Sequence, residues 1–204
     1  MGHHATTNTR RHIAEEAARI LAEQSHLSTD EARMRAAKRI GCTDGCQFPD
    51  NLEIEAALKA YRLVFHHGHA DTLLRLREMA RSAMKSLIMF YPQLIGPVLN
   101  GTADRHSCIS LLLFAETTED VILRLLELKI PWQEMARRLR YGNGDSQQRP
   151  LLSFIADSTE IELLVLTATE RRNPPIDPVA GGPLKGADLT HLDQLIRGGN
   201  SVDG

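Results

Sequence analysis

Aromatic side chains are scarce in this chain, at 4% of its 204 residues. So few rings give no sign of a platform on which the bases of a single-stranded nucleic acid could stack. Neither positive nor negative charge dominates, because 24 basic and 26 acidic residues leave a formal net charge of -2. This balance argues against a generally basic nucleic-acid surface, although it is compatible with a local basic patch.

Long hydrophobic runs are missing as well. No apolar run approaches the roughly 18 residues that a membrane-spanning helix needs, and the polar N-terminal residues lack the apolar region of a signal peptide. The three cysteines are an odd number, and without a secretory context they are expected to be reduced thiols. These absences predict a cytoplasmic protein with no membrane segment.

The first ninety residues carry the apolar spacing of amphipathic helices. Ser28 to Glu31 is a capping-box sequence, and Gly41 is a matching stop signal, which predicts a helix over residues 29–40. Further helices are predicted over residues 9–25, from Asp50 onward, and from Asp71 to about Tyr91. Residues 1–70 are therefore expected to form a helical N-terminal region, whose surface is a candidate for homo-oligomerisation.

From Gln93 onward the apolar pattern changes to a period of two, which indicates strands. The expected strands are 93–99, 108–114, 133–141, 151–156 and 160–167, with a helix over 117–128 and a last short helix over 188–196. Asn143-Gly144 predicts a hairpin between the third and fourth strands. The prediction is an α+β fold in which residues 71–197 form a mixed-sheet domain and residues 198–204 a disordered tail.

The most informative stretch lies between the first two expected strands. Gly96 and Gly101 would let backbone N–H groups approach an anion, and the hydroxyl groups of Thr102 and Ser107 would add donors. These four residues are candidate ligands of a phosphate group. The alternative is an ordinary β-hairpin with glycine-rich turns and no ligand.

The spacing of this stretch resembles the nucleotidyltransferase superfamily, which has the DNA polymerase β-like fold. Gly96-Pro97 matches the family's Gly-Ser pair, and the segment Ser107-Cys108-Ile109-Ser110-Leu111 matches its Ser-Asp-Ile-Asp-Leu. In that family the two aspartates hold divalent metal ions, and a third acidic residue lies on a later strand, which would be Glu162 or Glu160 here. Cys108 and Ser110 replace both aspartates, so the resemblance implies a degenerate member without a metal or cofactor and without catalytic residues.

Arginines on the third expected strand form a second candidate feature. Arg138 and Arg140 would share one face of that strand and could clamp a phosphate, because the guanidinium fork donates two parallel hydrogen bonds. The same arginines could instead be a solvated, charged sheet edge, or they could pair with Glu160 and Glu162.

Three functions therefore remain open. The leading one is a nucleotidyltransferase-like protein that binds a nucleotide, polyphosphate or other phosphate-bearing partner without transferring it. The second is an active nucleotidyltransferase, in which Asp104 or Glu116 would join Glu162 to hold Mg²⁺. The third is a helical interaction or dimerisation protein with no ligand.

Overall fold

The computed structural model describes residues 3–24, 27–42, 48–65 and 68–199. The chain divides into two compact units, Met1–His69 and Ala70–Gly204. The division lies one residue before the expected one, which follows residue 70. Each unit has its own hydrophobic core.

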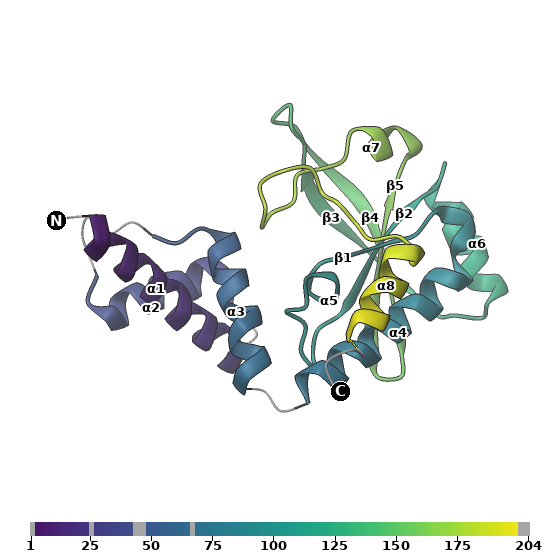
Figure 1. Cartoon of the computed structure of the whole chain (residues 1–204). Helices are drawn as coiled ribbons and strands as arrows, with labels where there is room; N and C mark the ends of the chain where they lie inside the picture. Colours follow the sequence, from purple (N-terminus) through teal and green to yellow (C-terminus); the bar gives the residue numbers. More distant parts are fainter. Residues whose placement is uncertain (1–2, 25–26, 43–47, 66–67, 200–204) are drawn as a thin grey trace. The chain divides into compact units, whose positions relative to one another are not determined.

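The first unit consists of three helices (Figure 1), which are α1 (His3–Glu23), α2 (Thr29–Ile40) and α3 (Asn51–Phe65). The expected capping box is present, because Ser28 accepts a hydrogen bond from the backbone of Glu31 and the Glu31 side chain accepts one from the backbone of Ser28. Gly41 ends α2 with φ 76° in the left-handed region. Ile13, Ile20 and Ile54 are buried between the helices.

The cysteines differ from the expectation of reduced thiols. Cys42, which follows α2, is disulfide-bonded, whereas Cys108 in the second unit is free. The expectation rested on cysteine number and on the absence of a secretory pattern, neither of which reports the distance between two thiols.

The second unit begins with α4 (His69–Ser86) and the short 3-10 helix η1 (Ile88–Phe90), and then forms a mixed sheet (Figure 1). The strands are β1 (Gln93–Ile95), β2 (Ile109–Phe114), β3 (Gln133–Arg140), β4 (Ser146–Ala156) and β5 (Thr159–Leu166). Their spatial order is β1-β2-β5-β4-β3, in which β2 and β5 are parallel and the other neighbours are antiparallel. Helices followed by a mixed sheet confirm the α+β prediction.

The two faces of the sheet are covered differently. On one face, α4, α6 (Thr118–Glu127) and α8 (Leu189–Gly199) bury residues such as Leu111, Leu163 and Val165 in the larger core. The other face carries a smaller apolar cluster that includes Leu112 and Leu164. We call this second face the open face.

Several element boundaries depart from the predicted ones. The first strand ends at Ile95, because the chain turns at Gly96 into the single helical turn α5 (Pro97–Asn100). The fourth strand begins at Ser146, five residues before the expected start, so the hairpin at Asn143-Gly144 is longer. The last helix ends at Gly199, so Gly198 and Gly199 are helical, and residues 200–204 of the expected tail lie outside the described residues.

In the part of the chain that the structure describes, no helix combines the length and apolar character needed to cross a membrane.

The backbone of Gly186 lies close to the side chain of Gln93. A Cβ at Gly186 would lie 2.6 Å from the Cβ of Gln93, closer than real side chains pack. We expect Gly186→Ala to lower the free energy of unfolding by about 1 to 3 kcal/mol, the usual range for overpacking. Chemical denaturation measures this loss. Gly182→Ala is the control, since nothing lies within 4 Å of its added Cβ, and equal losses in both variants would contradict the contact.

Candidate functional site

A cavity of about 560 Å³ lies in the second unit, over the open face of the sheet. Its wall combines the turn after β1, the end of β3, and the segment 176–184, which returns the chain across this face. That segment is held by two backbone hydrogen bonds, from Ile176 N to Arg140 O and from Leu184 N to Pro175 O, each 2.7 Å long. The residues that line the cavity include Gly96, Asn100, Ser110, Arg137, Arg138 and Arg140.

Gly96 shapes the turn at one side of the cavity. Its backbone has φ 73° and ψ -154°, a region that is essentially restricted to glycine. Nothing lies within 4 Å of the position where a Cβ would be. The requirement for glycine is therefore conformational, and the bare backbone leaves room beside the cavity for a ligand.

The other candidate donors of this stretch are engaged elsewhere. The carbonyl oxygen of Pro97 accepts hydrogen bonds from the backbone N–H groups of Gly101, Thr102 and Ala103 at 3.0 to 3.1 Å. Ser107 Oγ accepts from Asp104 N at 2.9 Å and donates to the Asp104 carboxylate at 3.1 Å. Gly101, Thr102 and Ser107 do not line the cavity. These donors form hydrogen bonds within the turn and stabilise it, which the spacing of the residues in the sequence does not indicate.

The side chain of Arg77 on α4 binds the backbone of this turn. Its guanidinium donates to the carbonyl oxygens of Val98 at 3.3 Å and of Leu99 and Leu195 at 3.4 Å, so it links α4 to α5 and α8. Burial lowers the pKa of Arg77. Removing part of this cation from water is costly, and its hydrogen bonds to carbonyl oxygens tie the wall of the cavity to the helical core.

The three positions matched to the family's carboxylates are close together. Ser110 on β2 lies directly beside Glu162 on the parallel strand β5, and Ser110 Oγ donates to Glu162 Oε2 at 3.0 Å. Cys108 Sγ lies 3.8 Å from Ser110 Oγ. Burial, and then the neighbouring Glu162 charge, raise the pKa of the Cys108 thiol. Glu162 is thus the single carboxylate of this group.

An arginine provides the positive charge next to Glu162. The Nη2 atom of Arg137 lies 2.8 Å from Glu162 Oε1 and 2.9 Å from Oε2. The Glu162 side chain is 12% exposed and the Arg137 side chain 38% exposed. Hydrogen bonds to both oxygens neutralise a carboxylate that is largely removed from water.

The sequence pattern indicated Arg138 and Arg140 as the candidate arginines and did not indicate Arg137. The strand register places Arg137 on the same sheet face as Glu162, through the pairs of Glu162 with Ser153 and of Ser153 with Gln133. Arg138 and Arg140 belong to the opposite face, but both line the cavity from the edge strand, and both are exposed. Alternation along β3 was visible in the sequence, but the register that assigns each face was not.

A second ion pair, with a buried carboxylate, holds the β4 strand of the hairpin. Arg149, the cross-strand neighbour of Arg137, lies 2.6 Å from Glu170 on α7 (Ala168–Arg172). Glu170 also accepts hydrogen bonds from Tyr141 and from Thr167. Burial alone would raise the pKa of Glu170, but these hydrogen bonds outweigh it, and the pKa is lowered. The two facing arginines therefore each have a carboxylate partner.

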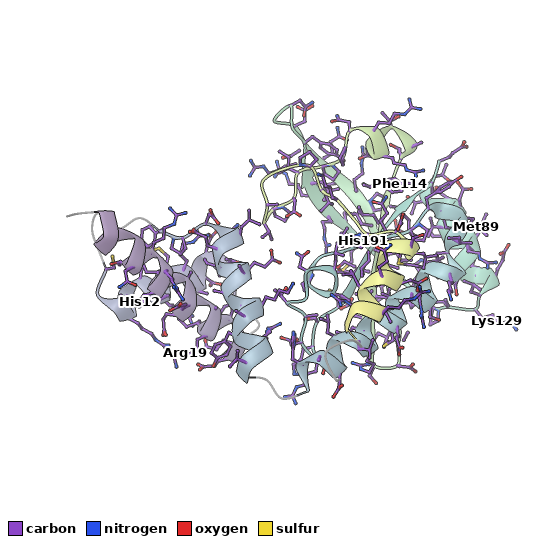
Figure 2. All side chains as sticks on the ribbon, viewed as in Figure 1. His12, Arg19, Met89, Phe114, Lys129 and His191 are labelled. Atoms are coloured by element: carbon purple, nitrogen blue, oxygen red, sulfur yellow. The ribbon has the colours of Figure 1, made fainter. Side chains whose placement is uncertain are left out.

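The guanidinium group of Arg171 on α7 is stacked against two aromatic rings near the end of β2. The guanidinium carbon of Arg171 lies 4.8 Å from the centre of the Tyr91 ring and 5.6 Å from that of Phe114, which Figure 2 labels. Such cation–π contacts favour a fixed position of α7 relative to the sheet. The anchor residue Glu170 is held in place by the same helix.

The carboxylates needed for metal catalysis do not converge. Asp104 accepts hydrogen bonds from His106 N and Ser107 Oγ and does not line the cavity, and Glu116 follows the far end of β2 from Ser110. Among the described residues, no group of three histidine, cysteine, aspartate or glutamate side chains could hold a metal ion. Glu162 is the one carboxylate among the three matched positions, and Arg137 neutralises it.

Comparisons with protein-family models and with curated proteins find no match to this chain.

Proposed function

We propose that the second unit binds a nucleotide or another phosphate-bearing ligand in the cavity on the open face, without a metal ion and without phosphoryl or nucleotidyl transfer. Arg137 would contact the ligand from the open face, and Arg138 and Arg140 would contact it from the edge of the sheet. In the terms of the resemblance, this is a nucleotidyltransferase-like protein with a degenerate metal site.

The observation that carries the proposal is the grouping of cations around a bare glycine turn. Arg137, Arg138 and Arg140 line one cavity together with Gly96 and Ser110. Within the described chain, Arg138 and Arg140 make no ion pair that would neutralise them. Asp177 is the carboxylate residue among those that line the cavity, so the three guanidinium groups outnumber it. A concave site with surplus guanidinium groups favours phosphate, because the planar fork matches its oxygen atoms.

Binding can be separated from catalysis in one experiment. ATP is titrated in the presence of a chelator and again with Mg²⁺, and pyrophosphate release is followed in the second sample. The proposal expects ATP to bind without Mg²⁺ and expects no pyrophosphate. Binding that requires Mg²⁺ together with pyrophosphate release would support the active-enzyme alternative instead.

The first unit supports a second candidate function, self-association. A groove of about 990 Å³ runs between α1 and α3, and Figure 2 labels His12 and Arg19 on its α1 side. Its α3 side includes the exposed apolar residues Ala56, Ala60 and Val64, of which Val64 is 65% exposed. The charged side chains of its α1 side form ion pairs within the chain, such as Arg11 with Glu15 and Arg19 with Glu16. A second copy packed with two-fold symmetry would cover the apolar α3 side of the groove and leave these ion pairs around it.

Val64→Glu tests this candidate. A charge on the apolar α3 side of the groove is expected to convert a dimer into a monomer, as measured by light scattering of the full chain. Leu52→Glu is a matched control, since Leu52 is on the same helix and 50% exposed but does not line the groove. A wild-type protein that remains monomeric at high concentration would contradict self-association.

A further inference from the structure

We infer that Glu162 competes with anions for Arg137: both oxygens of its carboxylate accept hydrogen bonds from Nη2 of Arg137, and its charge weakens the binding of every anion that enters the cavity and restricts binding to ligands with several phosphate charges. This inference rests on the proposed function of the cavity. It gives Glu162 a role opposite to that of a metal ligand, because removing its charge should strengthen ligand binding.

Two of the three guanidinium nitrogen atoms of Arg137 do not bind Glu162. Only Nη2 of Arg137 donates to Glu162, with 2.8 Å and 2.9 Å to the two oxygens. The Nε and Nη1 groups of Arg137 make no hydrogen bond within the described residues. A phosphate could therefore accept single hydrogen bonds from Nε or Nη1, whereas both two-donor edges of the guanidinium contain Nη2, which Glu162 occupies.

The carboxylate cannot move away easily when a ligand arrives. Ser110 Oγ donates to Glu162 Oε2 at 3.0 Å, and Ser153, the cross-strand neighbour on β4, is buried. The Glu162 side chain is 12% exposed, so solvent screens its charge little. A phosphate that contacts Arg137 would lie only a few ångströms from this fixed negative charge.

Charge then decides which ligands remain bound. The charges of Arg137 and Glu162 cancel, so net attraction comes from Arg138 and Arg140, which line the cavity and are exposed. Asp177 also lines the cavity and offsets one of these two charges. An anion with one charge gains little from these screened cations, whereas a chain of phosphates can contact all three arginines. Tripolyphosphate is therefore expected to bind much more tightly than inorganic phosphate.

Glu162→Gln is the direct test, because glutamine keeps the shape and an oxygen acceptor for Arg137 and Ser110 but removes the charge. In calorimetric titrations of the full chain with tripolyphosphate and a chelator, we expect Glu162→Gln to bind about tenfold more tightly than the wild type. Glu160→Gln is the matched control, since Glu160 is on the same strand and face but exposed. Its affinity should stay near the wild-type value, as should that of the charge-preserving Glu162→Asp.

The outcomes separate this inference from the proposed function. If the wild type binds and Glu162→Gln binds equally or more weakly, the competitor role is overturned while the proposed function stands. If neither protein binds tripolyphosphate, both are overturned. A gain in Glu162→Gln that disappears in the double variant Arg137→Ala with Glu162→Gln would establish that the carboxylate acts through Arg137.

Discussion

Replacing Arg137 with alanine is expected to weaken tripolyphosphate binding by about 10- to 100-fold, which corresponds to the roughly 1.5 to 3 kcal/mol of a hydrogen bond to a charged group. Arg137 is the cation on the open face of the sheet that lines the cavity and retains donors not used by Glu162. Calorimetry of the variant measures the loss directly.

The matched control for this variant is Arg105→Ala. Arg105 is exposed and does not line the cavity, so its replacement makes the same change in net charge at another place. Equal weakening in both variants would mean that overall charge, rather than the cavity, attracts the ligand. Because Arg137→Ala also leaves Glu162 without its cation, the double variant Arg137→Ala with Glu162→Gln distinguishes lost ligand contacts from a disturbed fold.

Glu170→Gln should cause the largest loss of stability among single substitutions at the paired carboxylates. The Glu170 side chain is 8% exposed and accepts hydrogen bonds from Tyr141, Arg149 and Thr167. Removing its charge leaves Arg149 without a counter-ion, and because Arg149 is 28% exposed we expect a loss of about 2 to 3 kcal/mol, somewhat below that of a fully buried pair.

The pH dependence of this loss has a definite sign. The pKa of Glu170 is lowered from 4.5 in the folded protein, so the unfolded chain takes up its proton first as the pH falls. The carboxylate therefore stabilises the wild type at neutral pH, and this contribution is lost as the pH falls below 4.5 and through the folded-state pKa. Denaturation of the two proteins should differ most at neutral pH and least in acid. A difference that grows on acidification would contradict the assignment.

The fold was largely predictable from the sequence because its signals are local. The capping box at Ser28 and the turn at Asn143-Gly144 act through neighbouring residues, so they mark a helix and a hairpin without any knowledge of packing. The end of β1 was less predictable. Gly96 and Pro97 are consistent with either a strand or a turn, and the single turn α5 depends on the tertiary contacts of Arg77.

The candidate site was predictable only in part, because it depends on long-range register. The proximity of Ser110 and Glu162 was expected from the resemblance, but the pairing of Glu162 with Arg137 depends on the alignment of three strands. The segment 176–184, which lines the cavity, is rich in proline and glycine. That composition predicts a surface segment over residues 171–183, and the resemblance implied that it would rim the pocket. Its contact with β3 is a backbone hydrogen bond to Arg140, which side-chain patterns do not report.

The central claim is that the cavity binds phosphate groups through arginines rather than through a metal ion. The most direct measurement is a titration of the wild-type protein with tripolyphosphate at low salt in the presence of a chelator, repeated at increasing salt. The account predicts saturable binding at one site that weakens as salt rises, because the contacts are ionic and partly exposed. A titration without saturable binding of tripolyphosphate at low salt would contradict it.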